Sequence, residues 1–179
     1  MNYQYGDATD PQGKELKLIA HICNDVGGWG AGFVLAISKR WRDPEESYYL
    51  WHKHRDLNNF ALGEIQTVQV ELDTYVVNMV AQHDIVPDAA GVPPIRYDAL
   101  KLCLEKLADE AIVLNASVHM PKIGAGLAGG DWNQIEALID ETIVARGITV
   151  TIYEWYRDKP HKPHKPHKKR PKNTMKKPS

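Results

Sequence analysis

Two glycine-rich stretches each follow an apolar run and precede a helical pattern. The first, CNDVGGWGAG, has four glycines within residues 27–32, and the second, PKIGAGLAGGDW, has four within residues 124–130. Glycine permits tight turns and a close approach of the backbone to a ligand, and N–H groups at a helix N-terminus attract anions. Both stretches are therefore candidate phosphate-binding loops. Together they could form two sides of one pocket for a diphosphate.

The second stretch also matches the dinucleotide fingerprint G-x-G-x-x-G over residues 124–129. Its position argues against a Rossmann-like nicotinamide-binding protein. That fingerprint belongs to the first strand–helix turn of its unit, and only one helix and one strand are expected after residue 130. Neither stretch contains the Gly-Lys-Ser/Thr of a P-loop. A glycine-rich turn without a ligand remains the alternative for either stretch taken alone.

Three polar side chains stand where apolar stretches end. Asp7 follows the first expected strand and either makes an Asx turn or accepts a hydrogen bond from a ligand amine. Asn24 ends a buried strand and is either a turn residue or an uncharged group that orients a ligand. Asp131 directly precedes the last helical pattern, with Gln134 three positions later, which resembles a capping box. A carboxylate at that position could also orient a water molecule.

The elements that must position these residues are strands interspersed with helices. In the helical patterns the apolar residues recur on one face, as Ile135, Leu138, Ile139 and Ile143 do. This arrangement predicts an α/β sandwich around a mostly parallel or mixed sheet. Residues 17–22 are nearly all apolar, which is typical of a central strand covered on both faces. The expected strands are residues 3–6, 17–22, 65–70, 75–80, 116–120 and 148–155, and the expected helices are 32–40, 44–55, 95–108 and 132–146.

Charge divides the chain into two parts. The formal net charge is −1, but residues 157–179 contain ten Lys or Arg and one Asp, so the first 156 residues are strongly acidic. The basic segment repeats Pro-His-Lys, and proline at every third position blocks helix and sheet, so we expect a disordered tail. Such a tail would bind nucleic acid or other polyanions without sequence preference, or fold back on the acidic body. Metal binding by its three histidines is a weaker alternative.

The remaining composition limits the class of protein. Cys23 and Cys103 both lie in apolar segments, which predicts buried thiols in a reducing cytosol and neither a disulfide framework nor a zinc site. No apolar run reaches the length of a membrane span, and the first residues lack the basic and apolar regions of a secretory signal. We therefore expect a cytoplasmic protein with no membrane partner, no metal site and no cofactor.

Taken together, residues 1–156 resemble a macro domain, the ADP-ribose-binding module. Gly6-Asp7-Ala8-Thr9 is similar to the family's G-D-[IL]-[TF], residues 18–24 to its strand ending in a ribose-facing Asn, and Trp29-Gly30-Ala31-Gly32 to its first glycine loop. PKIGAGL resembles P-[RK]-I-G-x-G-L, in the form of the branch that contains terminal ADP-ribose protein glycohydrolase and the yeast-type ADP-ribose-1''-phosphate phosphatase. The resemblance implies a three-layer α/β/α fold with a six-stranded mixed sheet and an ADP-ribose cleft at the strand ends.

The resemblance also implies roles for single residues. Asp7 would accept a hydrogen bond from the adenine amine, with Ala8 nearby. The distal ribose would be surrounded by Asn24, Gly30, Ala31 and Gly32. The diphosphate would lie on the backbone amides of Gly124, Ala125, Gly126 and Leu127.

Two departures from that branch bear on catalysis. The related glycohydrolase has a Lys shortly after a central strand, where Gln82 or a neighbour stands here, and an Asp directly after G-L, where this chain has Ala128. We therefore expect hydrolysis by a positioned water. Asn24 would orient the ribose, Asp131 or a ligand phosphate would position the water, and His83 would move protons near neutral pH. The alternative for Gln82 and His83 is a structural hydrogen bond at a strand end.

The function expected from these observations is binding of ADP-ribose and its hydrolytic removal from ADP-ribosylated acceptors, with ester-linked mono-ADP-ribose on Asp or Glu as the substrate. A non-catalytic ADP-ribose-binding module and an ADP-ribose-1''-phosphate phosphatase remain alternatives. The expected partners are ADP-ribose, ADP-ribosylated protein and, through the tail, nucleic acid.

Overall fold

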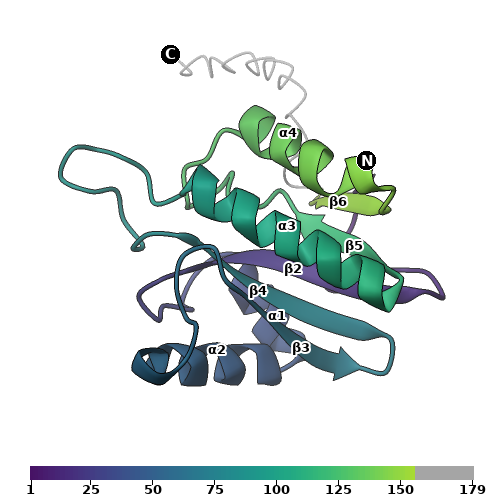
Figure 1. The fold of residues 1–179 in the computed structure, drawn as a ribbon, viewed down its shortest axis with the longest axis horizontal. Coiled ribbons are helices and arrows are strands. Elements are labelled where there is room, and N and C mark those ends of the chain that lie inside the picture. Colours follow the sequence, from purple (N-terminus) through teal and green to yellow (C-terminus); the bar gives the residue numbers. More distant parts are fainter. Residues whose placement is uncertain (156–179) are drawn as a thin grey trace, which may run out of the picture.

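The computed structural model describes residues 1–155, which form one mixed sheet of six strands between two layers of helices (Figure 1). The strands lie in the order β1-β6-β5-β2-β4-β3, and neighbours are parallel except for the antiparallel pair β3 and β4. Their bounds are β1 Asn2–Tyr5, β2 Leu16–Asn24, β3 Ile65–Glu71, β4 Thr74–Gln82, β5 Ala116–Pro121 and β6 Val150–Glu154.

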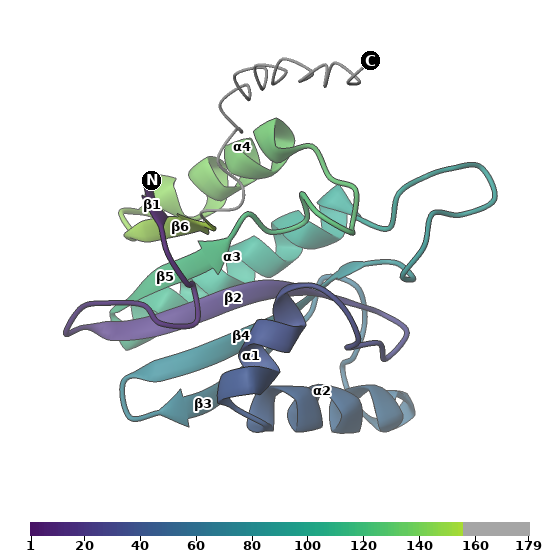
Figure 2. The same cartoon turned by 180° about the vertical axis from the view of Figure 1, so that it is seen from behind.

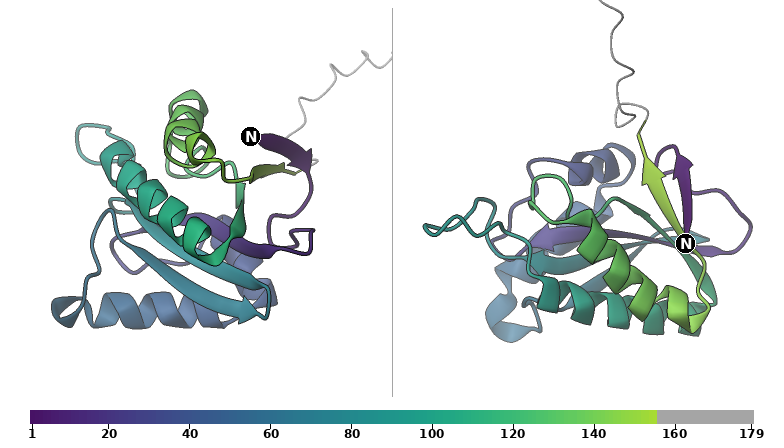
Figure 3. Two further views of the ribbon diagram at one scale, coloured as in Figure 1. Left: turned by 45° about the vertical axis from the view of Figure 1, so that its right-hand side comes forward. Right: turned by 90° about the horizontal axis from the view of Figure 1, so that it is seen from above.

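The helices are divided between the two faces of the sheet. Helices α3, Tyr97–Leu114, and α4, Trp132–Thr142, cover the face that Figure 1 presents. Helices α1, Phe33–Arg40, and α2, Asp43–Lys53, cover the opposite face, seen in Figure 2. The side view in Figure 3 separates the three layers. Short 3-10 turns follow α2 at Arg55–Leu57 and α4 at Val144–Arg146. The predicted three-layer α/β/α sandwich is confirmed.

Strand β2 is covered on both faces, which explains why its sequence is nearly all apolar. Leu18 and Ala20 join the core beneath α3 and α4, whereas Ile19 and Cys23 join the core beneath α1 and α2. Alternate side chains of a strand point to opposite faces, so a strand covered on both sides is apolar at most positions on both faces. The prediction of a doubly covered central strand is confirmed.

The two cysteines are free and buried, as predicted. Burial raises the pKa of the Cys103 thiol to about 12 and raises that of Cys23 well above its ordinary value. Both side chains are therefore neutral packing groups.

The largest error in the predicted boundaries concerns α3, which continues to Leu114, six residues past the expected end at residue 108. The acidic Asp109 and Glu110 interrupt the apolar pattern, but Ala111 returns to the buried face. The helix ends where Asn115 adopts a left-handed conformation with φ of 49°. Within residues 1–155, no helix has the length and apolar character needed to cross a membrane.

Three loops meet at one edge of the sheet. Parallel strands present their carboxyl ends on the same side, and β2, β4 and β5 are parallel neighbours in the centre of the sheet. Their carboxyl ends lead into residues 25–32, 83–96 and 122–131 respectively. Ligands of open α/β sheets bind at this edge. Both glycine-rich stretches belong to these loops.

Candidate functional site

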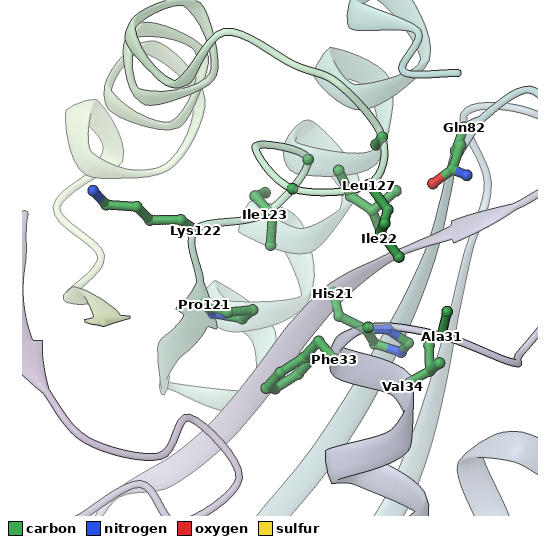
Figure 4. A pocket seen from close by; sticks show the side chains of 14 residues that line it. His21, Ile22, Ala31, Phe33, Val34, Gln82, Pro121, Lys122, Ile123 and Leu127 are labelled. Carbon is green, nitrogen blue, oxygen red and sulfur yellow. The ribbon is translucent and has the colours of Figure 1, made fainter. Parts of the chain in front are cut away.

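A cavity of about 260 Å³ opens at the carboxyl ends of β2, β4 and β5 (Figure 4). Its wall is formed by the start of α1, the end of β4 and the loop after β5. A smaller space of about 150 Å³ shares Ala31, Gln82 and Leu127 with it. The predicted ligand-binding residues that line one or both spaces are Asn24, Gly30, Ala31, Gly32, Gly124, Gly126 and Leu127.

Backbone N–H groups without protein partners border the cavity from two sides. Helix α1 begins after Gly32, where no side chain caps the first turn. Across the cavity, the described part of the chain offers no hydrogen-bond acceptor to the N–H groups of Gly124, Gly126 and Leu127. Uncapped N–H groups at a helix start and in a glycine loop carry partial positive charge. The arrangement suits an anion held between the two elements.

The glycines of the second loop serve two different purposes. A Cβ atom on Gly124 would lie 2.6 Å from Ile95 Cδ1, and one on Gly130 would lie 2.6 Å from the Gly124 carbonyl oxygen. These two positions are glycine because the loop is folded tightly against the core. Gly126 differs, because a Cβ atom there would meet nothing within 4 Å although the residue lines the cavity. Its missing side chain leaves space for a ligand.

The charge of Lys122 is directed away from the cavity. Its stem contributes to the lining, but its Nζ lies 2.5 Å from Glu154 Oε1 and 5.8 Å from the ring centre of Trp132 (Figure 4). An anion in the cavity would therefore be held by backbone dipoles and not by this ammonium group.

The Asn24 side chain folds its own loop. Its Nδ2 donates to the Gly28 carbonyl at 2.8 Å, and its Oδ1 accepts from the N–H groups of Val26 and Gly28 at 3.1 and 2.9 Å. The buried Tyr48 hydroxyl lies 2.9 Å from the same Oδ1, and burial raises the pKa of Tyr48, which keeps it a donor. The turn interpretation of Asn24 describes these contacts. Contact with a ribose stays a prediction, for which the second hydrogen of Nδ2 is suited.

Asp7 and Ala8 lie apart from the residues that line the cavity. Asp7 Oδ1 accepts from the Thr9 N–H and hydroxyl at 2.8 and 2.7 Å, which is an Asx turn. The other oxygen, Oδ2, lies 3.7 Å from Arg40, and Ala8 is buried. The turn interpretation of Asp7 accounts for Oδ1, and the adenine role of the two residues stays a prediction.

Asp131 caps α4 as expected, but the capping box is incomplete. Its Oδ1 accepts from the Asn133 N–H at 2.9 Å. A complete capping box would have the Gln134 side chain accept from the Asp131 N–H. That N–H instead donates to the Tyr97 hydroxyl at 2.9 Å. Tyr97 begins α3 and therefore ties the starts of two helices together. In the described structure, the predicted residues Asp131, Ala125 and His83 line neither space.

Two substitutions of Asp131 distinguish its role as the N-cap of α4 from any role of its negative charge. Asp131→Ala should lower the free energy of unfolding by about 1 kcal/mol, whereas Asp131→Ser should preserve it, because serine also accepts a hydrogen bond at an N-cap. Urea denaturation measures both. ADP-ribose affinity should be unchanged in the two variants, and loss of affinity in Asp131→Ser would show that the carboxylate acts on the ligand.

The side chains at the end of β4 are already hydrogen-bonded. Gln82, which lines both spaces, donates from Nε2 to the Asp84 carbonyl at 2.9 Å. His83 Nδ1 lies 2.7 Å from Asp25 Oδ2. Asp25 was not among the predicted site residues, although it directly follows Asn24 at the end of β2.

His21 is a further residue that the sequence did not reveal. It lines the cavity from within β2, and its Nε2 lies 2.5 Å from Asn78 Oδ1 on the neighbouring strand. Burial lowers the pKa of His21 to about 4, against the opposing effect of the Asn78 hydrogen bond. The imidazole is therefore neutral near pH 7 and adds no charge to the cavity. Within residues 1–155, no group of three or more His, Cys, Asp or Glu side chains could hold a metal ion.

Comparison with solved structures identifies the class. The fold is similar to that of a macrodomain protein from Streptomyces coelicolor, which is 50% identical, with a TM-score of 0.76 and coverage of 86% of this chain and 97% of that chain. A Bacteroides thetaiotaomicron protein of unknown function is 53% identical, with a TM-score of 0.83 and coverage of 85% and 96%. The chain belongs to the macrodomain family.

More distant relatives carry functional names. Chromodomain-helicase-DNA-binding protein 1-like of Danio rerio is 33% identical over 90% of this chain, which spans 16% of that protein's length. ADP-ribose 1''-phosphate phosphatase of Candida albicans is 24% identical, over 73% of this chain and 84% of the relative. Thermosipho africanus DarTG in complex with ADP-ribose has a TM-score of 0.62 at 16% identity, covering 77% of this chain and 38% of that chain. No family model matches the chain.

Proposed function

We propose that the cavity binds ADP-ribose, with the diphosphate between the start of α1 and the loop that contains Gly124, Gly126 and Leu127. The observation that carries the proposal is the presence of N–H donors without protein partners on both sides of the cavity. Backbone N–H groups can hold a dianion within an acidic domain. They donate hydrogen bonds without a charged side chain that neighbouring carboxylates would pair with. The names of two relatives, a phosphatase of ADP-ribose 1''-phosphate and an ADP-ribose complex, support this ligand.

The position of the smaller space suggests which end of ADP-ribose lies in it. Asn24, Gly30 and Ala31 line it, and it adjoins the diphosphate position through Leu127. The distal ribose would enter this space, and the adenine would extend toward Asp7 and Ala8 at the end of β1.

The proposed reaction is hydrolytic release of ADP-ribose from an ester-linked Asp or Glu of a modified protein. In the resemblance to the glycohydrolase branch, Gln82 or a neighbour stands near the position of its lysine, and Ala128 stands at the position of its acid. Ala128 is buried, and its carbonyl accepts from the Ile95 N–H at 3.1 Å, so it packs against the core. A water positioned by a ligand phosphate is therefore the nucleophile that we propose.

The phosphatase name of the Candida albicans relative favours a second candidate, removal of the 1''-phosphate from ADP-ribose-1''-phosphate. A binding module without turnover is the third. All three would use the same cavity and differ only in what is attached to, or released from, the distal ribose.

A parallel assay of two substrates distinguishes these functions. The protein is incubated with a peptide carrying mono-ADP-ribose on glutamate and, separately, with ADP-ribose-1''-phosphate. We expect ADP-ribose to be released from the peptide and no phosphate from the second substrate. Phosphate release alone would support the phosphatase, and binding of both without turnover would support the binding module.

The basic segment over residues 157–179 suggests a function separate from that of the cavity. The predicted tail over residues 157–179 lies outside the described residues, as does residue 156 of the predicted domain. We propose from its charge that it adds salt-dependent attraction to nucleic acid or to other polyanions.

A further inference from the structure

The mouth of the smaller space carries no charged side chain from the described part of the chain. Four of the residues that line this space are exposed to solvent, namely Gly30, Ala31, Ile85 and Leu127. Ile85 is 51% exposed and Leu127 is 71% exposed, so both turn apolar surface outward. The other lining residues are uncharged as well. A group that leaves this space therefore passes between apolar side chains and glycine backbone.

Ile85 is also the first residue of an exposed apolar segment. The stretch IVPDAAGVPP, which starts there, has Asp88 as its single charged residue. Residues 83–92 are all exposed, and the Val86 side chain is 60% exposed. The segment extends outward from the sheet beside the start of α3 (Figures 1 and 2). Exposed apolar residues that gather beside a ligand space indicate a contact surface for a partner.

The loop that carries this segment is held at its base and at its tip. At the base, the His83 N–H donates to the Pro94 carbonyl at 2.8 Å. At the tip, Asp88 Oδ1 accepts from the N–H groups of Ala90 and Val92, each at 2.9 Å. A surface that is already ordered loses less conformational entropy when a partner binds to it. The loop is therefore suited to recognition.

The Ile85 side chain connects this loop to the loop after β2. A Cβ atom on Gly28 would lie 2.7 Å from Ile85 Cδ1 and 2.9 Å from Asn24 Nδ2. Gly28 and Asn24 line the smaller space together with Ile85. One side of the Ile85 side chain thus belongs to the wall of the space in which the distal ribose is proposed to lie. Its exposed side continues into the apolar segment.

The acceptor of ADP-ribose is attached to the distal ribose, so its chain must begin at this mouth. The side chain of an Asp or Glu is short, and neighbouring residues of an extended peptide are about 3.4 Å apart. The residues next to the modified carboxylate are therefore within reach of Ile85 and Val86. The mouth offers them apolar surface to bury and no charged side chain with which to form an ion pair.

We propose that Ile85 and Val86 form an acceptor-binding surface, and that the substrates are proteins whose modified Asp or Glu is flanked by apolar side chains. The inference rests on the proposed binding of ADP-ribose with its distal ribose in the smaller space. It does not depend on turnover, because a binding module would contact the acceptor at the same place.

The test is calorimetry of the full chain with three peptides that carry ADP-ribose on the same central residue through a hydrolysis-stable linkage. The residues flanking the modified one are leucine, serine or lysine. We expect the leucine peptide to bind about tenfold more tightly than the serine peptide, because its flanking side chains bury apolar surface. The lysine peptide should bind no more tightly than the serine peptide at an ionic strength of about 0.15 M, which screens attraction to the acidic domain.

A substitution outside both spaces assigns this preference to the surface. Val86→Ser should lower the affinity for the leucine peptide about fivefold and leave the affinity for free ADP-ribose unchanged, because Val86 lines neither space. Val113→Ser is the matched control, since this valine is 82% exposed on α3 and also lines neither space. The control should change neither affinity.

The outcomes separate the acceptor-binding surface from the ADP-ribose site. Equal affinities for the three peptides, tightest binding of the lysine peptide, or an undiminished leucine preference in Val86→Ser would each overturn the proposal while free ADP-ribose still binds. If the wild-type protein binds neither free ADP-ribose nor any of the peptides, the proposed function fails, and the acceptor-binding surface fails with it.

Discussion

Gly126→Val should abolish ADP-ribose binding at micromolar concentration while leaving the free energy of unfolding unchanged. A side chain at Gly126 meets no atom of the protein within 4 Å, and the residue has no positive φ, so the fold accommodates it. The valine would instead occupy the cavity where the diphosphate is proposed to lie. Loss of one or two hydrogen bonds to a charged group costs about 1.5–3 kcal/mol each, which is about tenfold or more in affinity per bond. Calorimetry and urea denaturation measure the two effects.

Gly130→Val is the control for this result. The added Cβ would lie 2.6 Å from the Gly124 carbonyl oxygen, and backbone cannot move aside as a flexible side chain can. This variant should unfold at lower urea concentration as well as lose binding. If Gly126→Val binds ADP-ribose as wild type does, the diphosphate does not lie on this loop.

The protein should lose stability between pH 6.5 and pH 4.5 through two buried histidines. Burial lowers the pKa of His21 and of His119 to about 4. His119 is enclosed by the Ser117 and Tyr153 hydroxyls, each 2.7 Å from a ring nitrogen. In the unfolded chain both histidines titrate near the ordinary value of about 6.5. Below that pH the unfolded state takes up protons that the native state does not.

The sign follows from this proton balance. Because the unfolded state binds more protons in this interval, the free energy of unfolding falls as pH falls, by roughly 2–3 kcal/mol for each histidine at pH 4.5. Urea denaturation at several pH values measures the slope. His54→Asn, at an exposed position, should leave the slope unchanged, whereas His119→Asn should reduce it. A free energy of unfolding that stays constant across this interval would contradict the assignment of both rings as neutral.

The fold was largely predictable because its core is periodic. Residues of β2 are buried in both cores, and α3 and α4 each bury one apolar face. Burial of this kind produces apolar patterns that can be read from the sequence. The end of α3 was missed, because a buried Ala111 is a weaker signal than the two acids before it. The Rossmann-like alternative is wrong, since in the described part of the chain the loop over residues 122–131 follows the fifth of six strands and precedes α4, one 3-10 turn and β6.

The site was predictable where it depends on backbone and hidden where it depends on distant side chains. Clustered glycines indicate a close approach of the backbone, so both glycine-rich loops could be recognised in the sequence. The contact between Asp25 and His83 joins residues 58 positions apart, and only the parallel register of β2 and β4 brings them together. His21 was hidden for another reason, because in an apolar strand a histidine is indistinguishable from a core residue until its neighbours are known.

Titration calorimetry of the protein with ADP-ribose tests the central claim most directly, with NAD and ATP as comparison ligands. We predict saturable binding of ADP-ribose with a Kd near the micromolar range, about −8 kcal/mol. Binding of NAD and ATP should be much weaker, and Gly126→Val should bind none of the three. Absence of ADP-ribose binding at millimolar concentration would contradict the account.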